Sequence, residues 1–367
     1  MSIQTPQVLL FNGTIDIYAL GYISSIMDIE EYRTFQRDKL IDNEYSFEVK
    51  NFDNFFSVDN PISVFSGTSW RYSTIQVINE DGITIWDGIT QDIVRDHNSK
   101  KARIITVSNL MKFIDTNISY VSSDWETPAT AALNIMTTYG FTGYDSASIQ
   151  KSIQVLTAAS CYIKCNIEAK DNLTFRSALE KLSEYACADC FMMKGILYFK
   201  HYTAYTGGVS IYITEKDFIS TPVVSSLLSE MINDYRIGYQ NCGDVPATDA
   251  NQGNIAAVSR TQYSTKTLPE MKSDVNAQIK FKDATSARYI GECYIRRTHK
   301  ALSTIPAPLT QIDFNLQYYF KNNMDLQSYF RLTLSDEGWD EKLFETFKVG
   351  VNEENRSISI LALEVDE

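Results

Sequence analysis

The sequence predicts a β-rich α+β protein divided into several domains, the first of them a compact β-barrel or sandwich. The first observation is length, because 367 residues exceed what one ordinary hydrophobic core organises. The second is composition: 44% of the residues are hydrophobic and 22% are charged, as in globular proteins, and 12% are aromatic. Aromatic side chains fit half-buried pleated surfaces, which favours sheets and large interfaces. The third is a succession of short strand-like runs between turn signals.

The first domain, residues 1–120, is predicted to be a compact β-barrel. Closely spaced strands joined by short polar or glycine-containing turns are typical of barrels and sandwiches. The predicted strands are Gln7–Phe11, Ile15–Ile17, Glu44–Lys50, Ile62–Phe65, Tyr72–Asn79, Ile83–Trp86, Ile89–Val94 and Arg103–Val107. The turn signals include Asn12-Gly13, Ser66-Gly67, Asp81-Gly82 and Asp87-Gly88. The charged segment Glu30–Leu40 predicts a loop or a short exposed helix.

Residues 121–205 predict a small α+β domain. A helix over Ala129–Tyr139 follows Thr127-Pro128, because proline suits the first turn of a helix. A second helix begins near Asn172–Thr174, where Asn172 or Thr174 can cap it. Its apolar residues recur every three or four positions: Phe175, Leu179, Leu182 and Ala186. A hairpin over Phe191–Lys200, with its turn near Lys194-Gly195, completes the domain.

The rest of the chain predicts two further segments. Residues 206–290 return to strands, including Asp234–Tyr239, and contain an exposed loop at 241–254 rich in Asn, Asp, Gly and Pro. Residues 291–367 hold most of a helix over Thr285–Ala301 and then a series of closing strands. These strands are Thr310–Tyr319, Tyr329–Leu334, Leu343–Asn352 and Ser357–Val365, the last two joined by a turn at Glu353–Arg356.

The charge of the chain argues against a nucleic-acid-binding protein. The net charge is −13, and phosphate contacts need clustered Lys and Arg. Two basic clusters occur, Lys100–Arg103 and Arg296–Lys300, and each is predicted to lie on a solvated turn or helix face. No apolar run approaches the roughly 20 residues of a membrane helix, which predicts no stable membrane anchor. The N-terminus has no basic and apolar signal-peptide pattern, so we expect assembly in a cytoplasm with reduced thiols.

Four cysteines have a spacing that a structural zinc site can use. They form a Cys-x3-Cys pair, Cys161 and Cys165, and a Cys-x2-Cys pair, Cys187 and Cys190. The second pair lies at the end of an amphipathic helix and the first in an apolar, strand-like run, and free cysteines are commonly buried. Buried thiols are therefore the favoured interpretation, with zinc or a redox role as alternatives, and no cofactor is predicted.

No catalytic constellation is recognisable in the sequence. The three histidines, His97, His201 and His299, lie far apart and without partners at a triad or metal spacing. Carboxylates such as Asp28 with Glu30, or Asp336 with Glu337, can be imagined as glycosidase acids, but nothing singles one pair out. The tryptophans are predicted to anchor cores or interfaces, with sugar stacking as the alternative: Trp70, Trp86, Trp125 and Trp339. We therefore expect no enzymatic activity.

The order of elements resembles that of the tail hub proteins (baseplate hub or tail-tip hub) of tailed bacteriophages. Ile85–Ile93 is similar to the outward strand, glycine and returning strand of the first hub barrel. The other matching segments follow in order: Ile104–Asn109, the inter-barrel helix in Glu126–Met136, the helix in Leu173–Leu182 with the hairpin Gly195–Phe199, and the helix Ala287–Thr298 with the closing strands to Val365.

This resemblance implies two hub-type β-barrels with small α+β insert domains, in a virion protein of the tail tip. It implies a homotrimer with pseudo-sixfold symmetry that joins a sixfold tail tube or distal tail ring to a threefold spike or fibre. Its partners would be distal tail or tail tube proteins, a tape measure protein and spike or fibre proteins. A central channel would pass DNA, and an acidic lumen would keep DNA from adhering to it.

Three other functions remain open at this point. The chain can be another β-rich tail component, such as a distal tail or adaptor subunit. It can be a cell-wall-degrading tail enzyme, a hydrolase or peptidase that uses dispersed carboxylates. It can also be a glycan-binding receptor protein that uses its Trp and Tyr residues. Cell-wall hydrolysis or glycan binding by the purified chain would distinguish the last two from a connector.

Overall fold

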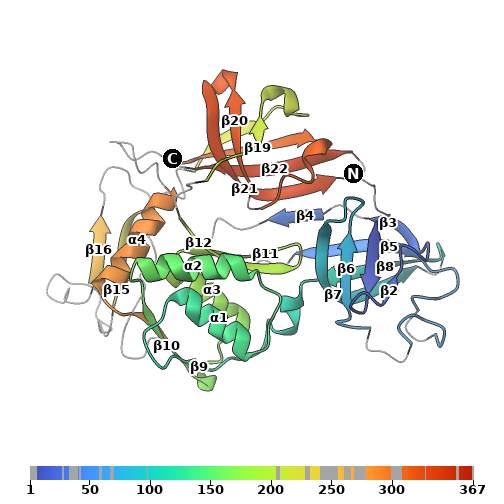
Figure 1. Ribbon diagram of the computed structural model, residues 1–367, viewed down its shortest axis with the longest axis horizontal. Coiled ribbons are helices and arrows are strands. Elements are labelled where there is room, and N and C mark those ends of the chain that lie inside the picture. Colours follow the sequence, from blue (N-terminus) through green and yellow to red (C-terminus); the bar gives the residue numbers. More distant parts are fainter. Residues whose placement is uncertain are drawn as a thin grey trace.

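The computed structural model places two seven-stranded β-sheets around a central helical unit; the first is antiparallel, and the second is antiparallel except for one parallel pair (Figure 1). It describes residues 6–26, 29–32, 40, 43–57, 60–66, 70–96, 98–203, 207–227, 232–239, 255–259, 266–267, 278–298, 308–326, 328–352 and 355–365. The predicted loop at 241–254, His97, His299 and the predicted helix beyond Thr298 lie outside these residues. Among the described residues, no helix combines the length and apolarity needed to cross a membrane.

The N-terminal sheet has seven strands in the order β2-β1-β6-β7-β8-β5-β3, and every neighbouring pair is antiparallel. Its strands are β1 Gln7–Leu10, β2 Ile15–Asp16, β3 Ile23–Ile26, β5 Glu44–Lys50, β6 Thr74–Ile78, β7 Thr84–Asp96 and β8 Lys101–Val107. The sheet curls around a core that includes Tyr45, Phe47 and Trp86. Alternating burial along β6 and β8 places one face of each strand on this core, as a half-buried sheet requires.

Strand β7 is one continuous strand where the sequence predicted two strands and a turn at Asp87-Gly88. Gly88 lies inside this strand, and no larger residue fits there. A Cβ at this position would stand 2.4 Å from the carbonyl oxygen of Val107 and 2.7 Å from Trp86 Nε1. A glycine inside a strand can mark such a close approach as well as a turn. The turn predicted at Asp81-Gly82 is present: Asn79 Oδ1 accepts hydrogen bonds from the backbone nitrogens of Asp81 and Ile83.

The predicted strand Ile62–Phe65 is wrong, since these residues form turns. Asn60 Oδ1 accepts from Ile62 N at 3.1 Å, and Ser63 Oγ accepts from Phe65 N at 3.1 Å. Short polar side chains that bond to nearby backbone offer an alternative to a strand ladder. The hydrophobic side chain of Phe65 is buried all the same, against the core of the N-terminal sheet.

The central helical unit contains the longest helices of the described residues. Its elements are η1 Asn109–Lys112, β9 Tyr120–Val121, α1 Pro128–Thr138, α2 Ser146–Ala158, β10 Ile163–Ile167, η2 Ala169–Asp171, α3 Phe175–Ala186, β11 Ala188–Met193, β12 Ile196–His201, β15 Ile232–Gly238, β16 Ile255–Ser259, β17 Lys266–Thr267, β18 Ile279–Phe281 and α4 Ala284–Thr298. Thr174, one of the two residues expected to cap α3, does so, and Thr127 caps α1; each accepts from a backbone nitrogen of the first turn.

The sequence did not predict α2, although Asp145 caps it by accepting from Ser148 N at 2.7 Å. Ile149 and Leu156 are buried, but serine, glutamine and threonine fill much of the rest of the helix, so its apolar stripe is narrow. Helix α4 packs against β15, and a Cβ on Gly291 would lie 2.3 Å from the ring of Tyr235. The glycine therefore sets the close spacing between α4 and β15.

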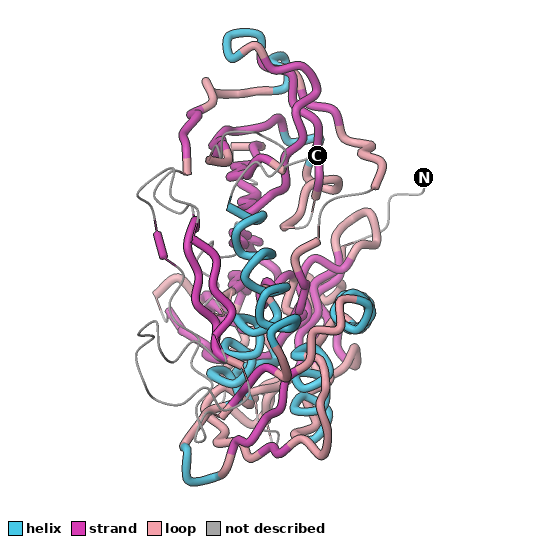
Figure 2. Tube along the Cα trace, turned by 90° about the vertical axis from the view of Figure 1, so that its left-hand side faces the viewer, coloured by secondary structure: helices cyan, strands magenta, loops and turns pink. Residues whose placement is uncertain are grey.

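The C-terminal sheet also has seven strands, in the order β13-β20-β21-β22-β19-β14, with β4 paired to β21. Its elements are β4 Ile29–Tyr32, β13 Tyr212–Ile213, η3 Glu215–Asp217, β14 Val223–Ser226, β19 Thr310–Gln317, η6 Tyr318–Phe320, β20 Tyr329–Leu334, η7 Ser335–Glu337, β21 Trp339–Asn352 and β22 Ser357–Glu364. Figure 1 shows β4 below β21, between the two large sheets. In the perpendicular view of Figure 2, this sheet lies above most of the helices.

Strand β4 corrects the prediction of a loop or exposed helix at Glu30–Leu40 for its first three residues, and residues 33–39 lie outside the described ranges. Residues Ile29–Tyr32 pair antiparallel with β21, with Ile29 opposite Val351 and Tyr32 opposite Lys348. A segment between two strands of the N-terminal sheet thus completes the C-terminal sheet. The strand was not predicted because its residues are charged and its pairing partner lies far away in the sequence.

Candidate functional site

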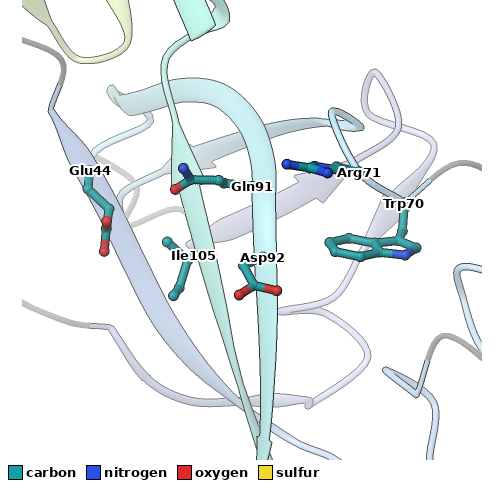
Figure 3. A pocket seen from close by; sticks show the side chains of 6 residues that line it. All are labelled: Glu44, Trp70, Arg71, Gln91, Asp92 and Ile105. Carbon is teal, nitrogen blue, oxygen red and sulfur yellow. The ribbon is translucent and has the colours of Figure 1, made fainter. Parts of the chain in front are cut away.

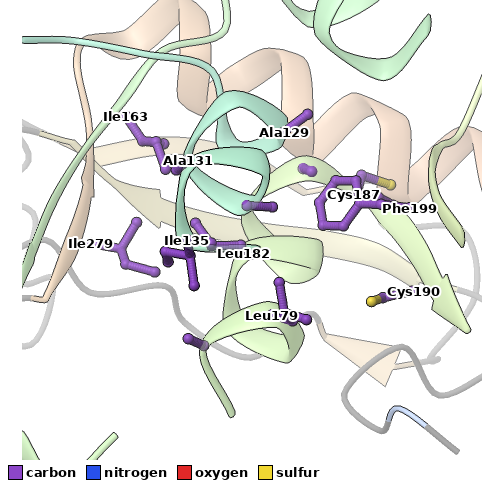
Figure 4. Close-up of a cluster of buried hydrophobic side chains, with 14 of the residues drawn as sticks. Ala129, Ala131, Ile135, Ile163, Leu179, Leu182, Cys187, Cys190, Phe199 and Ile279 are labelled. Atoms are coloured by element: carbon purple, nitrogen blue, oxygen red, sulfur yellow. The ribbon is translucent and has the colours of Figure 1, made fainter. Parts of the chain in front are cut away.

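The predicted zinc cysteines lie on different elements of the central helical unit. Cys161 precedes β10, Cys165 is in β10, Cys187 ends α3 and Cys190 is in β11, and all four are buried. Burial raises the pKa of the thiols of Cys161, Cys165 and Cys190. Within the described ranges, no group of three or more His, Cys, Asp or Glu side chains is arranged to hold a metal ion. Figure 4 shows Cys187 and Cys190 among the apolar side chains of this core.

His201 is the histidine that the described residues contain, and it lies in the core of the central unit. Its Nδ1 hydrogen-bonds with the carbonyl oxygen of Ala186, and its Nε2 lies 2.8 Å from Tyr289 Oη. The ring therefore ties β12 to the end of α3 and to α4. These contacts are structural and leave the imidazole buried.

Glu126 is the half-buried carboxylate with the most elaborate polar surroundings. Tyr120 Oη donates to it at 2.8 Å, and Asn134 Nδ2 donates to its Oε2 at 3.0 Å and to Tyr120 Oη at 2.9 Å. Burial raises the pKa of Glu126, and these hydrogen bonds oppose that rise. The three side chains satisfy one another directly before the capping residue of α1. The network fixes the start of that helix.

The tryptophans divide into core and surface residues. Trp86 is fully buried in the core of the N-terminal sheet, as expected of an anchor. Trp339 is half-buried against the C-terminal core, with Lys342 Nζ 4.1 Å from its ring centroid. Trp125 is half-buried before α1. Trp70 is half-buried as well, and it borders a surface hollow.

The hairpin β11–β12 is buried on both of its faces. Along β11, Cys190 and Met192 face the core of the central unit, while Phe191 and Met193 enter the core of the C-terminal sheet. On β12, Leu197 and Phe199 continue the first face, and Tyr198 continues the second. Adjacent strand residues point to opposite faces, so an uninterrupted apolar run indicates burial on both. Cys190–Met193 is such an uninterrupted apolar run, so the sequence itself indicates that β11 is buried on both faces.

The tip of the same hairpin docks on β7 of the N-terminal sheet. The carbonyl oxygen of Lys194 accepts from Asp87 N at 3.0 Å, and Asn43 Nδ2 donates to the carbonyl oxygen of Met192 at 3.0 Å. Gly195 has φ +80°, and a Cβ there would lie 1.7 Å from the carbonyl oxygen of Asp87. The hairpin therefore contacts both large sheets and the helices between them.

Two ion pairs extend from this hairpin. Arg297 of α4 pairs with Asp189 of β11, and both side chains are buried. Burial lowers the pKa of Arg297 and the neighbouring carboxylate of Asp189 raises it, with a net rise. On the same face, Lys200 of β12 is the register partner of Asp189, and its Nζ lies 3.0 Å from Glu345 Oε1 of β21. The predicted solvated location of the basic cluster is thus wrong for Arg297, because its partner Asp189 is distant in sequence.

The two large sheets also contact each other directly. Lys321 Nζ lies 3.3 Å from Glu80 Oε1, Asn79 Nδ2 donates to Asn322 Oδ1 at 3.4 Å, and Asn322 donates to Asp81. The predicted turn at Asp81-Gly82 is therefore where the β6–β7 connection meets the residues after η6. Together with β4 and the hairpin β11–β12, this contact fixes the sheets relative to each other.

The outer surface carries large apolar side chains on both sheets. In the N-terminal sheet region the exposed ones are Leu20, Phe52, Ile62, Tyr72, Ile83 and Val94, and in the C-terminal sheet region they are Tyr212, Ile219, Val223 and Tyr319. Val223 is 66% exposed and belongs to β14, which ends the order of the C-terminal sheet. The sequence of β14, Val-Val-Ser-Ser, contains no charge, and natural sheet edges commonly carry one to prevent association.

A hollow of about 460 Å³ opens on the outer side of the N-terminal sheet (Figure 3). It is lined by Glu44, Trp70, Arg71, Gln91, Asp92 and Ile105. These residues come from β5, from the segment before β6, and from β7 and β8. Only Trp70 is recognisable from the sequence, because the four segments that line the hollow come together only through strand pairing.

Comparison with known proteins shows the fold. No family model matches the sequence, and none of the curated proteins is recognisably related to it. Among solved structures, the 43 kDa tail protein of prophage MuSo2 from Shewanella oneidensis matches with a TM-score of 0.58 and 12% identity, over 99% of both chains. A tail protein from Neisseria meningitidis MC58 matches with a TM-score of 0.56 and 10% identity, over 98% of this chain and 97% of that one.

A third match is the prophage tail protein gp18 from Listeria monocytogenes EGD-e, with a TM-score of 0.54 and 10% identity. It covers 99% of this chain and 95% of that one. The agreement therefore extends over both large sheets and the unit between them. The fold expected from the sequence is confirmed: the chain has the multi-domain, β-rich α+β fold of bacteriophage tail proteins.

Proposed function

We propose that the chain is a structural protein of a phage tail, a hub that assembles as a homotrimer at the tail tip. The observation that carries the proposal is the fold match to three tail proteins over almost the whole of each chain. Connector proteins need rigid scaffolds and interfaces, and the two sheets here are held together at three places. The hub joins a sixfold tail tube or distal tail ring, and the tape measure protein within it, to a threefold spike or fibre.

The two seven-stranded sheets support the symmetry of this proposal. Three copies of a chain with two comparable sheets present six such sheets around one axis. A ring of this kind is sixfold in its architecture and threefold in its sequence, which suits a junction between the two symmetries. The exposed apolar side chains on both sheets provide candidate contact surfaces between copies and with other tail proteins.

The edge strand β14 is the surface that we assign to contact between copies. Its sequence is uncharged, and Val223 is 66% exposed. We expect the purified chain to have a mass in solution about three times 41.7 kDa and to form a ring in electron micrographs. A monomer without a central hole would contradict the hub.

Val223→Asp places a charge on this edge and should dissociate the ring without unfolding the chain. Val121→Asp is the matched control, because Val121 is 58% exposed but lies on the central helical unit. Retention of the ring by Val223→Asp would exclude β14 as the contact while leaving the hub proposal intact.

The acidic charge of the chain fits a channel for DNA. With a net charge of −13 per chain, a lumen lined by carboxylates would repel passing DNA and prevent adhesion. Cryo-electron microscopy of the ring tests this point, since a lumen lined mainly by Lys and Arg would contradict it.

We propose no enzymatic activity for the chain. Digestion of purified cell wall by the chain, lost on substitution of one Asp or Glu, would contradict this.

A further inference from the structure

We infer that the hollow bordered by Trp70, Gln91 and Asp92 is a carbohydrate-binding site. A hub that only connects other proteins does not require such a site, so the inference goes beyond the proposed function. It would give the tail tip a weak contact with sugars at a surface. Three features of the hollow point to sugar binding: the way its walls are built, the polar and aromatic side chains that converge there, and its size.

A β-bulge builds the floor of the hollow. Thr90 of β7 pairs with Thr106 and Asp92 pairs with Ile105, so Gln91 is an extra residue between the two pairs. In a regular strand, adjacent side chains point to opposite faces. At the bulge, Gln91 and Asp92 both line the hollow, as Figure 3 shows. Bulges commonly re-aim side chains at functional positions in this way.

Hydrogen bonds fix the wall that carries Trp70 against the same strand. Tyr72 N donates to the carbonyl oxygen of Thr90 at 2.8 Å, and Thr90 N donates to that of Ser73 at 2.8 Å. Ser73 Oγ donates to the carbonyl oxygen of Trp70 at 2.8 Å and lies 3.1 Å from Thr90 Oγ1. The aromatic wall and the polar floor therefore hold one arrangement, which reduces the cost of ordering them around a ligand.

The side chains that converge here suit a sugar. Sugar hydroxyls both donate and accept hydrogen bonds, and the lining offers both: Gln91 carries an amide, Glu44 and Asp92 carry carboxylates, and Arg71 carries a guanidinium. The flat, apolar ring of Trp70 suits the C–H face of a pyranose. A volume of about 460 Å³ lies within the range of small-molecule sites, about 300–1,000 Å³.

The same lining argues against two other ligands. An anionic ligand would meet the like charge of Glu44 and Asp92, whose carboxylates outnumber the guanidinium of Arg71. An apolar peptide side chain would bury against only Trp70 and Ile105, and it would take water from the four polar residues. A neutral ligand with many hydroxyl groups avoids both costs.

The test is binding of sugars to the purified full-length chain. Saturation-transfer NMR with glucose, galactose, rhamnose and N-acetylglucosamine, together with an array of bacterial surface glycans, identifies a ligand. Gln91→Ala and Asp92→Ala should each weaken its binding at least about fivefold, the effect of losing one hydrogen bond. Trp70→Ala should abolish binding, and Trp70→Phe should retain part of it. Circular dichroism confirms folding, and the Gln91 and Asp92 variants decide the outcome if Trp70→Ala unfolds.

Two matched controls isolate the hollow. Gln76→Ala removes the same type of side chain from the adjacent strand β6, and Tyr212→Ala removes an exposed aromatic ring from the C-terminal sheet. Both should bind the sugar as the unmodified chain does. Binding that is lost only in the variants of the hollow supports the inference. No binding by any probe, equal loss in the controls, or binding of free arginine in place of sugars would overturn it.

Discussion

The backbone nitrogen of Asp87 donates a hydrogen bond of 3.0 Å to the carbonyl oxygen of Lys194. This bond joins the middle of β7 to the tip of the hairpin β11–β12, more than a hundred residues later in the chain. The hairpin also supplies side chains to the cores on both of its faces. This short contact is therefore one of the three that hold the N-terminal sheet in place relative to the other two units.

Gly195→Ala should separate the hairpin tip from β7. The substitution meets a positive φ of +80° and a Cβ position 1.7 Å from the carbonyl oxygen of Asp87, so we expect a loss of about 2–4 kcal/mol in unfolding free energy. Gly13→Ala is the matched control, because Gly13 has φ +82° but no atom within 4 Å of its Cβ position. Denaturant unfolding of both variants measures the difference. Equal losses would show that the tip contact adds nothing to backbone strain.

Asp87→Asn should make the stability of the chain less dependent on pH. Burial raises the pKa of Asp87, so the folded chain binds this proton more tightly than the unfolded chain does. Stability is therefore lost as pH rises from the ordinary carboxyl value of about 3.9 through the raised value of the folded state. The stability of Asp87→Asn relative to the unmodified chain should be greater at pH 7 than at pH 4. Urea unfolding at both pH values tests this, and a constant difference would contradict it.

The pair Arg297 and Asp189 should be costly to break from one side only. Asp189→Ala leaves a buried guanidinium without its carboxylate, which typically costs about 3–5 kcal/mol. The double variant Asp189→Leu with Arg297→Met should recover most of that loss, because two apolar side chains need no partner in the core. Thermal unfolding compares the variants. A double variant as unstable as the single one would contradict this, because the loss of stability would then not come from the unpaired buried charge.

The buried thiols should resist alkylation in the native chain. Cys161, Cys165, Cys187, Cys190 and Cys293 are buried, and burial raises the pKa of three of them, which suppresses the reactive thiolate. Iodoacetamide followed by peptide mass spectrometry should find these five unmodified before denaturation and modified after it.

Treatment with EDTA should leave the melting temperature unchanged. A fall in melting temperature together with released zinc would restore the zinc interpretation.

The elements predicted best are those determined by local sequence. Glu44–Lys50 and Tyr329–Leu334 are strands with the predicted limits, and the hairpin turn lies at Lys194-Gly195 as expected. Each has an apolar pattern and turn chemistry that agree within a few residues. What the sequence could not predict depends on distant partners: the pairing of β4 with β21, the burial of Arg297 beside Asp189, and the passage of β7 through Gly88.

The candidate sugar site follows the same rule. Trp70 is recognisable in the sequence as a residue that can stack on a sugar, but Glu44, Gln91 and Ile105 have no common signal. They become neighbours because β5, β8 and β7 lie side by side in the N-terminal sheet. The bulge that turns Gln91 toward the hollow depends on the register between β7 and β8, which is a property of the pair of strands.

The pairing of β4 with β21 has a consequence for the synthesis of the chain. Ile29–Tyr32 leaves the ribosome long before Lys348–Val351, its partner in the sheet, which follows about 300 residues later. At about 5–20 residues per second, β4 waits on the order of 15–60 s for that partner. During this interval the N-terminal sheet can complete its own pairing, whereas the C-terminal sheet cannot. Strands made late therefore close the C-terminal sheet over a strand made early.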